Sequence, residues 1–278
     1  MTIRVGRIPY INCYPVYGAI DRGIVPLDAE LVTGVPTRLN ALMATGALDV
    51  SVVSAVEYAR DWERYLLLPD LGITCDGPVR SVMLFSSRPA QELTGARLVV
   101  SRSSMTSVAL LELLFTNVWH ARPEFIPGDA EPRDFPAADR ADARLVIGDA
   151  ALLLQSGDHA ATKDFPYAYD LGAEWKAWTG LPFVFAVWVA QRSTPTDDAL
   201  GAHAALIKSR DWGLAHLGEL ALQAHAATGV NDRDCLTYLS GLDWRLSLPH
   251  LKGLTEFFNR LEQAGKVRAG KLVFLSAA

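Results

Sequence analysis

The sequence predicts an α/β fold with two lobes and a ligand cleft between them. Strand-like apolar runs alternate with helix-like segments through residue 155, and the connections between them are short. After Thr194 the pattern is helical only. The chain has 278 residues, and single hydrophobic cores tend to divide at roughly 250–300 residues. Two α/β units followed by helices therefore favour two lobes.

Apolar runs rich in β-branched residues predict the strands, and apolar residues spaced three and four apart predict the helices. The expected strands cover residues 5–8, 31–35, 49–53, 79–86, 97–101, 125–126, 145–147 and 182–191. The expected helices cover residues 36–45, 54–65, 103–120, 150–155, 196–227, 231–241 and 248–265. This alternation indicates a mainly parallel sheet.

Capping residues mark several of the expected helix starts. Ser54 and Glu57 have the spacing of a capping box, in which a serine precedes the helix and a glutamate occupies its third position. Thr196, Asn231 and Ser247 are the N-cap candidates of the last three helices.

The order of the elements predicts a discontinuous lobe. We expect the chain to leave the first lobe near residue 87 and to return near residue 190. Residues 1–87 and 190–278 then form lobe one, which includes the C-terminal helices, and residues 88–189 form lobe two. A cleft between two such lobes is a common site for a small ligand.

Composition and charge exclude several classes of protein. Half of the residues are hydrophobic and 21% are charged, which excludes wholesale disorder. The formal net charge of −5 leaves no cationic surplus for binding nucleic acid. The longest apolar run covers residues 181–190, whereas a membrane helix needs about 20 residues. Residues 1–15 lack the apolar segment of a secretory signal, so we expect a cytoplasmic protein without a membrane partner.

Motifs for cofactors and metals are absent from the sequence. Cys13, Cys75 and Cys235 are widely spaced and form no CxxC pair, so neither a disulfide framework nor a structural zinc site is expected. There is no GxGxxG after a strand, no P-loop lysine motif, no HExxH and no GxSxG. We therefore expect neither a nucleotide cofactor nor a bound metal.

Small polar residues follow the expected strands, which is where open α/β sheets bind ligands. Asn12 lies after the first strand and is either a ligand contact, since its amide both donates and accepts, or a turn residue that caps the next helix. Ser54 follows the third strand, where a helix N-terminus also offers amides to an anion. Ser81 lies near the expected crossing between the lobes and by itself indicates only a strand serine.

Hydroxyl groups are concentrated at residues 101–107, at the start of a predicted helix. Five hydroxyls in seven residues exceed what capping one helix requires, so Ser104, Thr106 and Ser107 are candidates for binding a carboxylate. Gly148 and Asp149 follow another strand and either cap the next helix, the interpretation we favour, or complete the pocket. Together these residues predict a site for an anionic organic ligand.

Two blocks of the sequence are specific, the opening Tyr-Ile-Asn-x-x-Pro at 10–15 and Thr-Gly-Leu-Pro-Phe-Val-Phe at 179–185. They belong to a larger set of characteristic segments at 4–15, 36–40, 46–49, 54–58, 77–82, 104–108, 147–149 and 178–188. In these segments the chain resembles the menaquinone-biosynthesis family of the futalosine pathway, and within it the chorismate dehydratases. The resemblance extends over nearly the whole chain.

The resemblance implies a type II periplasmic-binding-protein fold, which consists of two α/β lobes and a hinge. It implies a cofactor-independent carbon–oxygen lyase that converts chorismate to 3-[(1-carboxyvinyl)oxy]benzoate and water, the first step of the futalosine route. The key asparagine of the family corresponds to Asn12 and its key serine to Ser81.

Neither Asn12 nor Ser81 is a competent base at neutral pH. A carboxylate such as Glu57 or Asp149 is one candidate for removing the ring proton. The other is the enolpyruvyl carboxylate of the substrate itself, which we favour because the motifs supply hydrogen-bond donors rather than charges.

Three other functions are considered. The sister enzyme 1,4-dihydroxy-6-naphthoate synthase has an Asp after its early Asn, which this chain lacks. A non-catalytic binding protein for small carboxylates has the same fold, because fold does not decide function. A ligand-sensing regulator needs a DNA-binding domain, for which neither length nor charge leaves room.

Overall fold

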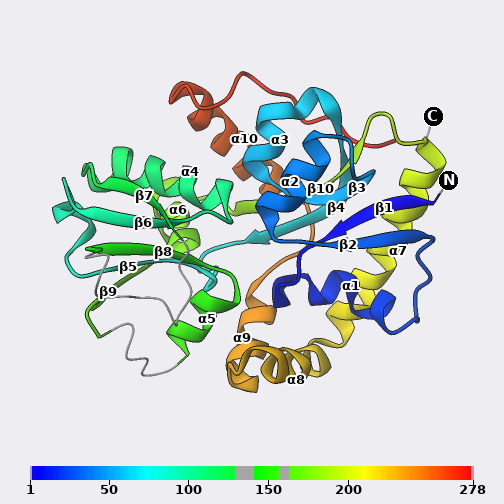
Figure 1. Cartoon of the computed structure of the whole chain (residues 1–278), viewed down its shortest axis with the longest axis horizontal. Coiled ribbons are helices and arrows are strands. Elements are labelled where there is room, and N and C mark those ends of the chain that lie inside the picture. The colour runs from blue at the N-terminus through cyan, green and yellow to red at the C-terminus, as the bar shows by residue number, and fades with distance from the viewer. Residues whose placement is uncertain (1, 129–140, 157–162, 277–278) are drawn as a thin grey trace.

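The computed structural model describes residues 2–128, 141–156 and 163–276, and these form two five-stranded sheets. The first sheet contains β1 (Ile3–Arg7), β2 (Ala29–Thr33), β3 (Val50–Ser54), β4 (Tyr65–Cys75) and β10 (Phe183–Gln191), in the order β2-β1-β3-β10-β4. The second contains β5 (Val82–Ser86), β6 (Arg97–Ser101), β7 (Glu124–Gly128), β8 (Ala143–Ile147) and β9 (Tyr167–Asp170), in the order β7-β6-β8-β5-β9. Figure 1 shows the sheets in separate lobes, the first on the right and the second on the left. The predicted two-lobed α/β fold is confirmed.

Helices cover both sheets. They are α1 (Tyr14–Asp21), α2 (Pro36–Ala44), α3 (Ala55–Asp61), α4 (Met105–Leu114), α5 (Asp149–Gln155), α6 (Leu171–Thr179), α7 (Thr196–Ala215), α8 (Leu217–Thr228), α9 (Asp232–Gly241) and α10 (Leu248–Gln263). The C-terminal helices pack on the first lobe, where α7 contacts α1 and α10 contacts β10 (Figure 1). The single helix predicted at 196–227 is divided into α7 and α8, because the backbone leaves the helical region at His216.

Two of the three predicted caps of the late helices are present. The Asn231 side chain accepts a hydrogen bond from the Asp234 amide at 2.8 Å, and Ser247 forms a capping box with His250. Thr196 is instead the first residue of α7, and Pro195 occupies the N-cap position. Proline is tolerated at the start of a helix because the N–H that it lacks would have no partner inside the helix.

Each sheet is mixed, whereas the sequence predicted mainly parallel pairing. In the first sheet β1 is parallel to β2 and β3, but β10 is antiparallel to β3 and β4. In the second sheet β6 is parallel to β7 and β8, but β5 is antiparallel to β8 and β9. The antiparallel strands β5 and β10 are the ones that enter a sheet from the other lobe. Such a strand is not constrained by the helical crossover that makes neighbouring strands parallel.

Strand pairing also corrects the predicted lobe boundaries. Since β5 belongs to the second sheet and β10 to the first, the crossings lie at 76–81 and 180–182 rather than at 87 and 190. Glycines with positive φ turn the chain at both crossings, Gly77 at 115° and Gly180 at 72°. The prediction from the order of the elements placed β5 and β10 in the wrong lobes. The strands with which each of them pairs are distant in sequence, so the order does not reveal the pairing.

Tryptophans anchor the strand that returns to the first lobe. Trp175 and Trp188 are fully buried, and each indole N–H finds an acceptor at 3.1 Å, the Pro182 carbonyl and the Tyr17 hydroxyl respectively. Burying an aromatic ring with its polar atom satisfied stabilises the core without a desolvation penalty. These rings belong to the core and to the hinge between the lobes.

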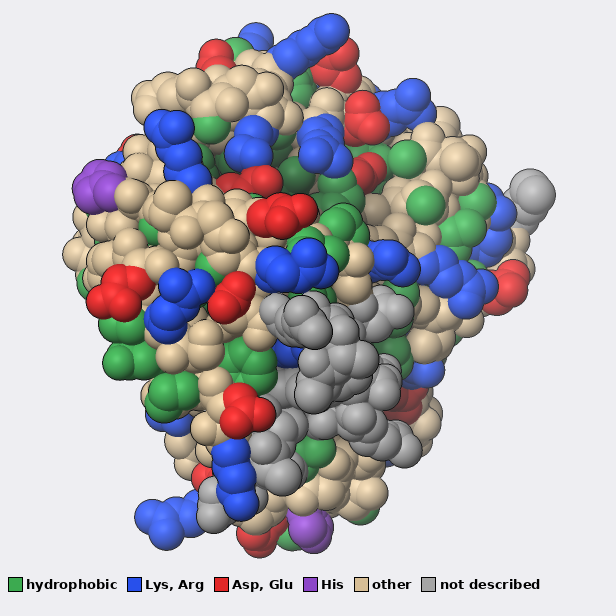
Figure 2. Space-filling view, turned by 60° about the vertical axis from the view of Figure 1, so that its left-hand side comes forward, with side chains coloured by type: hydrophobic (Ala, Val, Ile, Leu, Met, Phe, Trp, Pro, Cys, Tyr) green, Lys and Arg blue, Asp and Glu red, His purple; other side chains and the backbone are tan. Residues whose placement is uncertain are grey.

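The surface is mixed in charge. Figure 2 shows Lys and Arg side chains interspersed with Asp and Glu on the face that it displays. In the described part of the chain, no helix combines the length and hydropathy that crossing a membrane requires. The same residues contain no group of three or more His, Cys, Asp or Glu side chains placed to hold a metal ion.

Candidate active site

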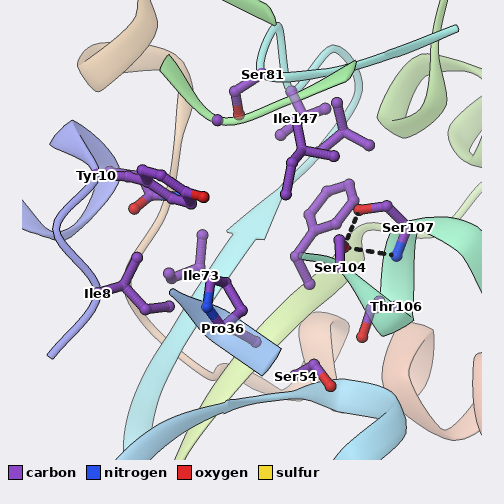
Figure 3. A pocket seen from close by; sticks show the side chains of 16 residues that line it. Ile8, Tyr10, Pro36, Ser54, Ile73, Ser81, Ser104, Thr106, Ser107 and Ile147 are labelled. Atoms are coloured by element: carbon purple, nitrogen blue, oxygen red, sulfur yellow. Dashed lines mark hydrogen bonds between the residues drawn. The ribbon is translucent and has the colours of Figure 1, made fainter. Parts of the chain in front are cut away.

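A pocket lies between the two lobes, next to the ends of several strands (Figure 3). It has about 580 Å³ of empty space, a figure that includes the solvent at its open mouth. Seven of the eight predicted site residues line it, and they come from both lobes: Asn12, Ser54, Ser81, Ser104, Thr106, Ser107 and Gly148. Asp149 does not line the pocket.

Ser54 is held at the end of β3 by two donors. Its hydroxyl oxygen accepts from the Glu57 amide at 3.2 Å, as the predicted N-cap of α3, and from Asn40 Nδ2 at 3.1 Å. The Asn40 carbonyl oxygen accepts in turn from the Ser54 amide at 3.2 Å. Because both lone pairs of the Ser54 hydroxyl are used, its proton is available to a ligand acceptor. The sequence did not identify Asn40 as a partner of Ser54.

The hydroxyl cluster at the start of α4 faces the same space. Ser104 caps α4 by accepting from the Ser107 amide at 3.2 Å, and it donates to the Ser107 hydroxyl at 2.7 Å (Figure 3). Thr106 Oγ1 accepts from the Val56 amide at 3.1 Å, which joins α4 of the second lobe to α3 of the first. The hydroxyls and the positive end of α4 make this side of the pocket suited to a carboxylate.

A strained turn at Arg80 positions Ser81 at the pocket. Arg80 adopts a φ of 63°, a left-handed conformation that costs free energy in a residue with a side chain. Asp170 holds this turn by accepting from the Val79 amide at 3.0 Å and the Arg80 amide at 2.6 Å. The Ser81 carbonyl also accepts from the Gly148 amide at 2.7 Å, so its backbone is fixed on both sides.

Asn12 carries an unusual polar atom. Its side-chain oxygen Oδ1 is buried and has no hydrogen-bond partner among the described residues. Its backbone oxygen accepts from Trp244 Nε1 at 2.7 Å. The N-cap residue of α1 is Cys13, and that of the short 3-10 turn Ile11–Cys13 is Tyr10. Asn12 therefore caps neither helix. A buried acceptor without a partner is costly unless a ligand supplies the donor.

The two candidate carboxylates lie outside the pocket lining. Asp149 accepts from the Ile11 amide at 3.2 Å, and burial raises its pKa from 3.8 to about 6. Its side chain therefore joins the lobes and does not cap α5, so the predicted cap by Asp149 is wrong; Gly148 occupies the N-cap position. Glu57 accepts from the Tyr65 hydroxyl at 3.1 Å, and burial also raises the Glu57 pKa. The described lining contains no Asp, Glu, Lys, Arg or His side chain.

Apolar side chains complete the walls, and the sequence did not identify them. They include Tyr10, Pro36, Ile73 and Ile147, which Figure 3 labels, and Phe185. A Cβ atom at Gly148 would approach the Tyr10 ring at 3.3 Å, so the absence of a side chain lets this ring lie against the backbone. An uncharged pocket with apolar walls and several hydroxyls fits a flat ring that carries polar substituents.

Comparison with known proteins identifies the relatives of this chain. A family profile described as menaquinone biosynthesis matches residues 3–263. The chain belongs to the menaquinone biosynthesis family. A protein from Thermus thermophilus named chorismate dehydratase is 32% identical over 270 residues, covering 91% of this chain and 95% of the relative. A chorismate dehydratase from Campylobacter jejuni is 31% identical over 186 residues, covering 65% of this chain and 64% of the relative.

Solved structures place this family member among the periplasmic-binding-protein folds. Protein AF1704 from Archaeoglobus fulgidus superimposes with a TM-score of 0.78 at 18% identity, over 96% of this chain and 98% of that one. The periplasmic aliphatic sulphonate binding protein SsuA from Escherichia coli gives a TM-score of 0.63 at 12% identity, over 98% of this chain and 95% of that one. At these identities the similarity establishes the fold alone.

Proposed function

We propose that this member of the menaquinone biosynthesis family is a chorismate dehydratase that releases water and 3-[(1-carboxyvinyl)oxy]benzoate, as a carbon–oxygen lyase. The observation that carries the proposal is the buried Oδ1 of Asn12, which has no partner among the described residues, in a pocket whose described lining is uncharged and contains several hydroxyls. The relationship to the Thermus protein of that name, which extends over nearly the full length of both chains, supports it.

The hydrogen-bonding groups of chorismate match those of the pocket in one orientation. Chorismate carries two carboxylates, one ether oxygen and one ring hydroxyl, and at neutral pH only the hydroxyl is a donor. Since Asn12 Oδ1 requires a donor, the ring hydroxyl binds there. One carboxylate then accepts from the hydroxyls at the start of α4, and Ser54 offers a further donor on the same side. Ser81 binds another oxygen of the ring substituents.

The reaction removes a ring proton and the ring hydroxyl. The electrons of the broken C–H bond form a ring double bond, the C–O bond breaks, and the departing hydroxyl takes up the proton that was removed from the ring and leaves as water. The product is aromatic, which supplies the driving force. The enolpyruvyl carboxylate of the substrate takes the ring proton and passes it to the departing hydroxyl, because no carboxylate of the described residues lines the pocket. The protein contributes by holding that carboxylate against the ring C–H in a reactive geometry.

Two alternatives predict different products. A naphthoate synthase of the sister branch would leave chorismate unchanged and convert a cyclic futalosine derivative. A binding protein, like the Escherichia coli structural neighbour, would bind a carboxylate without changing it.

Incubation of the purified protein with chorismate, without metal or nucleotide, tests the proposal. We expect an aromatic absorbance to appear and mass spectrometry to record the loss of one water. Unchanged chorismate would contradict the proposal. In that case, turnover of the cyclic futalosine derivative would identify the sister enzyme, and tight binding without turnover would identify a binding protein.

A further inference from the structure

We propose that Tyr238 is a positioning residue that joins Asn12 and Ser81 into one hydrogen-bond chain and directs both side chains at the substrate. This inference rests on the proposed function, in which Asn12 and Ser81 contact chorismate. Tyr238 itself does not line the pocket.

Tyr238 brings together three segments that are far apart in sequence. It lies on α9, is 1% exposed, and its hydroxyl is 2.9 Å from Ser81 Oγ. The Asn12 side chain lies beside the same hydroxyl and acts to lower its pKa, as a hydrogen-bond donor to that oxygen does. One phenol oxygen thus connects the loop after β1 with the residue that precedes β5.

The direction of the chain follows from the atoms available. Asn12 Oδ1 has no partner in the part of the chain that the structure describes, so the Asn12 atom that faces Tyr238 is the amide nitrogen, which can only donate. The Tyr238 oxygen accepts that bond and gives its own proton to Ser81 Oγ. The Ser81 proton is then free to be donated into the pocket. A ligand therefore meets an acceptor at Asn12 and a donor at Ser81.

The surroundings of Tyr238 keep this arrangement fixed. Burial raises the pKa of Tyr238, so its hydroxyl stays protonated and able to donate. Trp244, which follows α9 and is fully buried, donates to the Asn12 backbone at 2.7 Å. The end of α9 and the loop after it thus hold both the backbone and the side chain of Asn12.

Without the Tyr238 hydroxyl, the Ser81 hydroxyl can rotate and the Asn12 amide loses the partner that fixes which of its atoms faces the ligand. The pocket keeps its shape and its other donors, so binding of chorismate is affected little. Elimination depends on accurate placement of the departing hydroxyl, and misplacement by about 1 Å can cost about a hundredfold in rate. The expected effect is therefore on kcat rather than on KM.

Tyr238→Phe tests the proposal, with Tyr17→Phe as the matched control. Tyr17 is equally buried, but its hydroxyl donates to the Gly6 carbonyl at 3.0 Å, within the core of the first lobe. We expect Tyr238→Phe to lower kcat about tenfold to a hundredfold with KM changed less than about threefold. Tyr17→Phe should lower thermal stability about as much as Tyr238→Phe does, but it should leave kcat within about twofold of the wild type. In a Ser81→Ala background, the effect of Tyr238→Phe should be much smaller, because the chain is already broken.

An unchanged kcat in Tyr238→Phe would overturn the proposal. So would an equal fold loss of kcat when Tyr238→Phe is introduced into the wild type and into the Ser81→Ala variant. Equal losses in both tyrosine variants would show a structural role only. Crystal structures of the wild type and of Tyr238→Phe provide a test without turnover: rotation of the Ser81 hydroxyl or of the Asn12 amide supports the proposal, and unchanged side chains contradict it. If the wild type does not convert chorismate, the proposed function fails, and these structures still decide the role of Tyr238.

Discussion

Replacing Asp149 by asparagine separates the charge of this buried side chain from its hydrogen bond. Asp149 accepts from the Ile11 amide at 3.2 Å, across the boundary between the lobes. Asparagine has nearly the same shape, and its carbonyl oxygen can accept the same bond. The substitution therefore removes a titratable group without removing the contact.

The structure fixes the sign and the size of the effect on stability. Burial raises the pKa of Asp149 from 3.8 to about 6, which corresponds to a penalty of up to roughly 3 kcal/mol when the group is charged. Because the folded state binds this proton more tightly than the unfolded state, the wild type loses stability as the pH rises from about 4 to 6. The amide introduced by Asp149→Asn does not titrate, so the variant should be more stable than the wild type at pH 8, and the difference should vanish near pH 4.

Urea unfolding at pH 4, 6 and 8 measures this difference, and chorismate turnover at pH 8 is measured on the same samples. Glu30→Gln, which removes an exposed carboxylate from β2, is the control and should change neither quantity. We expect Asp149→Asn to retain turnover within about threefold, because Asp149 does not line the pocket. Loss of turnover with unchanged chorismate binding would make Asp149 the general base and refute the reasoning. An unchanged pH dependence of stability would refute burial as the cause of the raised pKa.

Three further substitutions test separate parts of the account. Glu57→Gln should also retain turnover, since this carboxylate lies outside the pocket lining, and an inactive, folded variant would contradict substrate-assisted proton removal. Thr106→Val leaves a buried amide of α3 without its acceptor and should lower the free energy of unfolding in urea by about 1–3 kcal/mol, whereas Thr106→Ser should not. Gly253→Ala would place a Cβ atom 2.0 Å from the Pro182 carbonyl oxygen and should lower the unfolding free energy by roughly 1–3 kcal/mol, whereas Gly201→Ala, in open space on α7, should not. Equal effects in either pair would contradict the assigned contacts.

Most of the candidate site could be predicted because of where polar residues fall relative to strands. Ser54 and Ser81 lie at strand ends, and Ser104 opens a helix after a strand. In α/β folds these junctions meet at the edge of the sheet, so their positions in sequence imply proximity in space. Asp149 occupies the same kind of junction, but its side chain accepts a hydrogen bond from the Ile11 amide of the other lobe. The local sequence around Asp149 does not predict this partner.

The rest depends on contacts between distant parts of the chain. Strand β4 was not predicted, because Pro69 and Asp70, the latter with a φ of 55°, interrupt its apolar pattern. It forms because β10 pairs along it from more than a hundred residues away. Asp170 and Tyr238 lie on elements with no local signal for a site, and only the folded chain brings them to the turn before Ser81.

The central claim is that the pocket between the lobes removes water from chorismate, with Asn12 holding the departing hydroxyl. Single-turnover rates and binding constants of the wild type and Asn12→Ala, measured on chorismate under identical conditions, test it most directly. We expect the wild type to form the aromatic product. We expect Asn12→Ala to bind chorismate within about tenfold of the wild type and to react at least about a hundredfold more slowly. Equal losses of affinity and rate, or an unchanged rate, would contradict the account.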